Sequence, residues 1–93
     1  MGDASMKAYL VESYVPDLDE AVAARTASSL CAATAELRAR GVTIEFLHSF
    51  AVLGDETNFS LFSATGPADV RRAAELARVV SDHLAEVTFY SCD

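Results

Sequence analysis

The side chains best suited to chemistry in this sequence are one histidine, one glutamate and two tyrosines. His48 interrupts an apolar stretch, and its imidazole could ligate a metal or transfer a proton near neutral pH. Glu12 is the only acidic residue in the first apolar stretch, where a buried carboxylate is costly unless it faces a partner or a pocket. Tyr14 and Tyr90 could donate hydrogen bonds to a polar ligand. Each also has a simpler interpretation. His48 could be a core or interface histidine, Glu12 a paired carboxylate, and the two tyrosines part of aromatic packing.

Other side chains favour no particular chemistry. Cys31 and Cys92 are too far apart for a CxxC motif and too few for a disulfide framework, so two reduced thiols are expected, with Cys31 as a small packing residue of a helix. Asp55 and Glu56 are interpreted as turn residues rather than cation ligands, and His83 is expected in a solvated loop. The sequence lacks a glycine-rich phosphate loop, an HExxH motif and a GxSxG nucleophile elbow, which disfavours a nucleotide enzyme or a serine hydrolase.

Composition and charge set the broad class of protein. The chain has 93 residues, 52% of them hydrophobic, which predicts a single domain (1–93, core 6–91) with some apolar surface meeting another chain. Fourteen acidic and seven basic residues give a net charge of −7, and this field repels nucleic acids and anionic membranes. No apolar run reaches the roughly 18 residues of a membrane span, and residues 1–5 do not resemble a signal peptide, so a cytoplasmic location is expected.

Hydrophobic periodicity predicts the first two elements. Residues 6–15 are rich in aromatic and branched side chains and end at a proline, which predicts a strand. A helix is predicted from the capping residues Asp17 and Asp19 to Arg40, and Gly41 is expected to end it in a left-handed conformation.

The second half of the chain predicts a hairpin, a helix and a last strand. Residues 42–53 alternate with a period of two, and six of them share one face of a predicted strand: Val42, Ile44, Phe46, His48, Phe50 and Val52. A turn at 54–56 leads into a third strand at 58–64. Pro67 suits the first position of a second helix, whose end the pattern leaves undefined. Residues 86–91 are predicted as the last strand.

The order strand, helix, strand, strand, helix, strand predicts an α+β fold, the ferredoxin-like βαββαβ sandwich. Its four-stranded antiparallel sheet carries both helices on one face. The other face should be polar, yet the first strand is apolar on both faces, and Leu47, Leu53 and Phe62 lie opposite the main apolar sets of their strands. A second copy could cover that face, so a homodimer through the sheet face, a dimeric α/β barrel, is expected.

Four segments of the chain resemble a known family. They are KAYLVESYVPDL, RARGV, GDETNFSLFSA and GPADVRRAAELA, and they are similar to a family of small bacterial proteins of unknown function. That family has the ferredoxin-like dimer fold and includes a nickel-binding actinobacterial member, so the resemblance implies a divalent metal such as nickel. The nickel-binding member carries two histidines in its first strand where this sequence has Glu12 and Ser13. Imidazole is the ligand that nickel favours, so this sequence lacks two of the nickel ligands that the resemblance would imply.

Two classes of function follow from these residues, and a purely structural or regulatory interaction module is a third possibility. The first is a small cytoplasmic dimeric binding protein, whose ligand is a small molecule or a metal ion held between sheet and helices or at the dimer seam; His48 and Glu12 are the weak candidate ligands for a metal. The alternative is a cofactor-free enzyme of cyclase, isomerase or monooxygenase type. In that case Glu12 or His48 abstracts a proton, and a tyrosine, Tyr14 or Tyr90, binds the substrate by donating a hydrogen bond to the developing oxyanion.

Overall fold

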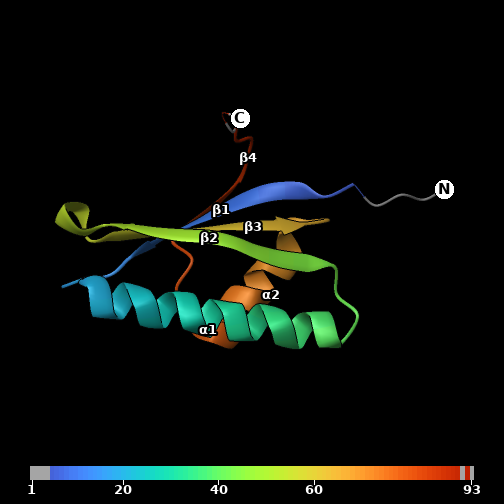
Figure 1. The fold of residues 1–93 in the computed structure, drawn as a ribbon, viewed down its shortest axis with the longest axis horizontal. Helices are drawn as coiled ribbons and strands as arrows, with labels where there is room; N and C mark the ends of the chain where they lie inside the picture. Colours follow the sequence, from blue (N-terminus) through green and yellow to red (C-terminus); the bar gives the residue numbers. More distant parts are fainter. Residues whose placement is uncertain (1–4, 91, 93) are drawn as a thin grey trace.

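The computed structural model describes residues 5–90 and 92, and it places two helices on one face of a four-stranded antiparallel sheet (Figure 1). The elements are β1 (Lys7–Tyr14), α1 (Glu20–Ala39), β2 (Ile44–Val52), the short 3-10 helix η1 (Leu53–Asp55), β3 (Thr57–Ala64), α2 (Pro67–Ala77) and β4 (His83–Val87). The strands lie side by side in the order β2-β3-β1-β4. The predicted ferredoxin-like α+β fold is therefore confirmed. Within the described residues, neither helix is long and apolar enough to cross a bilayer.

Both helices begin and end where local chemistry requires it. The Asp19 carboxylate caps α1 by accepting a hydrogen bond from the amide of Val22 at 2.8 Å, and Gly41 follows the helix with a φ of 91°. The end of α2, undefined in the sequence, comes at Ala77. Arg78 takes the left-handed conformation, and its amide donates to carbonyls of the last helical turn.

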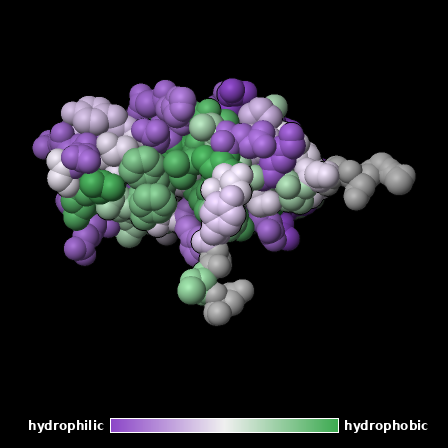
Figure 2. Space-filling view, turned by 90° about the horizontal axis from the view of Figure 1, so that it is seen from above, coloured by the Kyte–Doolittle hydropathy of each residue, from purple (hydrophilic) through white to green (hydrophobic). Residues whose placement is uncertain are grey.

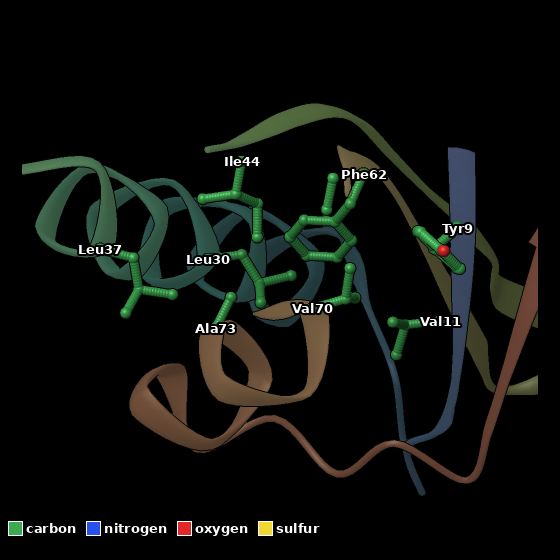
Figure 3. Close-up of a cluster of buried hydrophobic side chains, with 9 residues drawn as sticks. Tyr9, Val11, Leu30, Leu37, Ile44, Phe62, Val70 and Ala73 are labelled. Carbon is green, nitrogen blue, oxygen red and sulfur yellow. The ribbon is translucent and has the colours of Figure 1, made fainter. Parts of the chain in front are cut away.

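The hydrophobic core lies between the sheet and the helices, with Phe62 of β3 at its centre (Figure 3). The Phe62 side chain is fully buried and points toward Leu30 of α1 and Val70 of α2. Tyr9 and Val11 of β1 complete the sheet side of the core. The sequence placed Phe62 opposite Phe59 and Leu61 but left open which face meets the helices; β3 turns its even-numbered residues, Phe62 among them, toward the helices.

A β-bulge divides the predicted apolar face of β2 in two. The register between β2 and β3 shifts between Phe46 and His48, so Phe46 pairs with Phe62 on the helix side. After the bulge His48 pairs with Leu61, and it faces away from the helices. A strict period of two would have kept Phe46 and His48 on the same face, so the sequence interpretation of His48 as part of the Ile44 face is wrong.

The last strand also differs from the prediction. β4 begins at His83, not at residue 86, and ends at Val87, while Ser91 lies outside the described residues. His83 is therefore a strand residue and not part of a loop. Cys31, predicted as a packing residue, is exposed on α1, and both Cys31 and Cys92 are free thiols.

Candidate site on the open sheet face

The sheet face that points away from the helices is called the open face below. Its residues alternate with the buried ones along each strand and are Ala8, Leu10, Glu12 and Tyr14 of β1, Glu45, His48, Phe50 and Val52 of β2, Thr57, Phe59, Leu61 and Ser63 of β3, and His83, Ala85 and Val87 of β4. Figure 2 looks onto this side and shows hydrophobic side chains over its centre and one end, with hydrophilic side chains around them. Phe50 is 52% exposed there, so a large apolar surface faces water.

Glu12 lies in a row of four residues that crosses the whole sheet. It pairs with Phe59 on one side and with His83 on the other, and Phe59 in turn pairs with Phe50. The two phenylalanine rings stack with their centroids 5.0 Å apart. Directly opposed residues of antiparallel strands hold their Cβ atoms within about 5.5 Å of each other. The open face therefore sets a carboxylate and an imidazole side by side at the end of an aromatic wall.

Three hydrogen bonds position His83 beside Glu12. The amide of Asp82 donates to the Glu12 carbonyl at 2.9 Å, and the Asp82 carboxylate accepts from the amide of Tyr14 at 2.7 Å. Two residues before Asp82, the carbonyl of Val80 accepts a hydrogen bond from the Ser13 hydroxyl at 2.6 Å. Together these bonds tie the segment before β4 to β1, and they fix the register that pairs His83 with Glu12.

Tyr14 stands at the end of β1 and is 57% exposed. Its hydroxyl donates to the Glu56 carboxylate at 3.2 Å, and the other oxygen of that carboxylate accepts from the amide of Asp17. The hydrogen bond to Glu56 and its negative charge raise the pKa of Tyr14 above 10.0, because ionisation would place two negative charges together. The hydroxyl proton of Tyr14 is thus already donated to Glu56 of the same chain.

The other predicted site residues lie apart from Glu12. His48 is two strands away from Glu12, which separates their backbones by about 10 Å or more. Tyr90 follows β4, whose last residue Val87 pairs with Ala8, six residues along β1 from Tyr14 or about 20 Å. One chain therefore does not bring the four residues predicted from the sequence together.

His83 is the residue that the sequence interpretation missed. The signal that could have found it is the alternation of residues 83–87, in which Leu84 is the apolar residue that packs against the core. Extending the last strand back to residue 83 puts His83 on the opposite side from Leu84, beside Glu12.

The part of the chain that the structure describes does not gather a complete set of metal ligands. Among residues 5–90 and 92, no group of three or more histidine, cysteine, aspartate or glutamate side chains could hold a metal ion. The paired Glu12 and His83 supply a carboxylate and an imidazole, two side chains that can bind a divalent metal. A metal bound here would therefore need further ligands from another molecule.

The space between sheet and helices is filled by the core, so the hollows of the surface lie elsewhere. One hollow of about 450 Å³ is lined by Met6, Arg38 and residues 41–45, and one of about 300 Å³ lies beside the start of β1 and the end of β4. Neither includes Glu12 or His48. The open face is thus the part of the surface where most of the predicted site residues gather.

Comparison with known proteins gives one informative match. No family model matches the chain, and no curated protein matches it either. The crystal structure of SCO4226 from Streptomyces coelicolor A3(2) is similar over 90% of this chain and 99% of that one, with a TM-score of 0.75 at 14% sequence identity. The likeness shows a shared fold. It agrees with the fold that the sequence resemblance implies, while the metal that the resemblance implies stays a prediction.

Proposed function

We propose that the protein is a homodimeric binding protein, in which the open faces of two copies meet and a ligand binds at the seam beside Glu12 and His83. The observation that carries this proposal is the apolar open face itself. Water contacts Phe50 and Val52 directly, and the half-buried Leu10, Phe59 and Leu61 continue the apolar surface inward. A cytoplasmic location stays a prediction from the sequence.

The size of the open face supports a dimer. The strands contain 8, 9, 8 and 5 residues, and at a spacing of about 4.8 Å they cover roughly 500 Å² in projection; the accessible area of the side chains is larger. A standard interface buries about 800 Å² of accessible surface on each partner. Covering this face also removes an apolar patch of the kind that single-chain proteins rarely leave in water.

Dimerisation would also bring together more side chains that can bind a metal. A two-fold axis through the open face brings the same residues of both copies to the seam, so that two Glu12 and two His83 side chains become available. His48 lies two residues along β2 from Phe50, the β2 member of the Glu12 row, and its copies add two further imidazoles. This is the form in which the implied metal, nickel or another divalent ion, fits the residues of this chain.

The first experiment is sedimentation equilibrium of the wild-type protein at micromolar concentration. A mass of two chains is expected, and a single-chain mass would contradict the proposal. Metal analysis of tag-free protein, followed by nickel and zinc titrations, then tests the ligand. The expected stoichiometry is at most one seam site per dimer, weakened by His83→Ala and by Glu12→Gln.

The control for these variants is Glu75→Gln, because Glu75 is exposed on α2 and lies on the helix layer. His48→Ala separates the contribution of β2 from that of the Glu12 row. If the purified protein holds no metal and all variants titrate like the wild type, the metal part of the proposal is wrong. The dimer would then be tested with small organic ligands instead.

The aromatic wall beside Glu12 favours one second candidate, a cofactor-free enzyme. The stacked Phe50 and Phe59 rings could hold a planar substrate next to the Glu12 carboxylate, which would accept a proton. Tyr14 is a poor oxyanion donor in this scheme because its proton already binds Glu56. Wild-type turnover that survives both Glu12→Gln and His83→Ala would exclude these residues as the proton acceptor.

A further inference from the structure

The chain after β4 leaves the sheet and carries two adjacent aromatic side chains into water. Residues 88–90, called the C-terminal arm below, follow Val87 and rise from the sheet on the side opposite the helices (Figure 1). Phe89 is 53% exposed and Tyr90 is 90% exposed. Within one chain Tyr90 therefore gains little from folding, and about half of Phe89 still faces water.

The C-terminal arm is continuous with the open face. Val87, its point of departure, pairs with Ala8, and both belong to the open face. The hollow of about 300 Å³ at the foot of the arm is lined by Met6, Lys7, Ala8, Glu86, Val87, Thr88 and Phe89. A molecule seated on the open face would thus meet both the arm and this hollow.

We infer that the C-terminal arm of each copy packs its two aromatic side chains against the partner copy, and so anchors the dimer beyond the contact between the two sheets. The inference rests on the proposed homodimer. A second copy is the occupant that the geometry favours because the arm projects on the same side as the uncovered face. Two-fold symmetry then gives every arm the same surface to contact.

Aromatic side chains suit such an anchor for two physical reasons. They bury a large area at a small cost in conformational entropy, and tyrosine adds a polar end that tolerates a partly wet rim. Residues of this kind carry much of the energy of protein interfaces. Phe89 supplies the apolar body near the foot of the arm, and Tyr90 lies farther out.

The test compares the dimer dissociation constants of three proteins by sedimentation equilibrium. The arm variant is Phe89→Ser/Tyr90→Ser. The control variant is Leu76→Ser/Val80→Ser, which also removes two exposed apolar side chains but leaves the arm and the open face intact. Circular dichroism checks that both variants fold. We expect the arm variant to raise the dissociation constant at least about thirtyfold, which corresponds to about 2 kcal/mol, and the control to leave it unchanged.

Each other result has a definite meaning. A dimeric wild type with an unchanged constant for the arm variant would overturn the role of the arm and leave the homodimer standing. Equal weakening by the arm variant and by the control would overturn it as well. A wild type that stays monomeric at micromolar concentration would overturn both the homodimer and the arm.

Discussion

A charge placed at the centre of the open face should separate the two copies without unfolding either. Leu61 is the residue to change, because it lies in an inner strand between His48 and Leu10 and is only partly buried within one chain. Leu61→Asp therefore leaves the core intact, since the side chains that fill the core point to the other face of β3.

The size of the effect follows from burial and symmetry. Complete burial of a leucine stabilises by about 1.5–3 kcal/mol, and since Leu61 gains most of this within one chain, at most about 1 kcal/mol is left for the interface. The seam contains two copies of the residue, so at most about 2 kcal/mol is lost. Burying two unpaired carboxylates costs at least about 2 kcal/mol more. The total of about 4 kcal/mol predicts a dissociation constant about a thousandfold higher.

The assay is a concentration series in sedimentation equilibrium, with chemical denaturation as a check on folding. Leu76→Asp is the matched control, because Leu76 is 44% exposed on α2, away from the open face. The reasoning is refuted if Leu61→Asp remains folded and dimerises as tightly as the wild type. It is refuted equally if Leu76→Asp dissociates the dimer to the same extent.

Three further predictions follow from individual contacts. Glu56→Gln should lower the raised pKa of Tyr14, and Glu45→Gln should not, in near-ultraviolet titrations read against Tyr14→Phe. Because this pKa is raised by folding, its contribution to stability is complete below pH 10.0 and disappears as the pH rises through the folded-state value; equal midpoints in both variants would contradict the role of Glu56. Phe62→Ala should reduce the free energy of unfolding in urea by about 3–5 kcal/mol, and a loss under about 1 kcal/mol would show that the core had been misassigned. Asp82→Ala should remove about 1 kcal/mol and speed hydrogen exchange at the Tyr14 amide, whereas unchanged exchange there would rule out the bond to Asp82.

Local signals in the sequence determined the element order. Asp19 and Gly41 mark the two ends of α1, and Pro67 marks the start of α2, because caps and turns depend on residues that are neighbours in the chain. The apolar character of β1 on both faces was also visible in the sequence, and it led to the expectation that something covers the open face.

Positions that depend on pairing between strands could not be predicted in the same way. The period of two assigned His48 to the face of Phe46, but the bulge between them moves His48 to the open face. A bulge arises from the match between two strands, and nothing in β2 alone requires it. Which face of β3 meets the helices could likewise not be predicted, because the pattern NFSLFSA is apolar on both faces.

The candidate site shows the same division between local and tertiary information. The sequence by itself determined that Glu12 is a carboxylate in a central strand, and that the order of elements is that of a ferredoxin-like fold. Only the tertiary structure decided that His83, and not His48 or Tyr90, lies beside it. The physical reason is that residues 71 positions apart meet through the register of β1 and β4, and that register is set by the Asp82 and Ser13 hydrogen bonds and not by the composition of either strand.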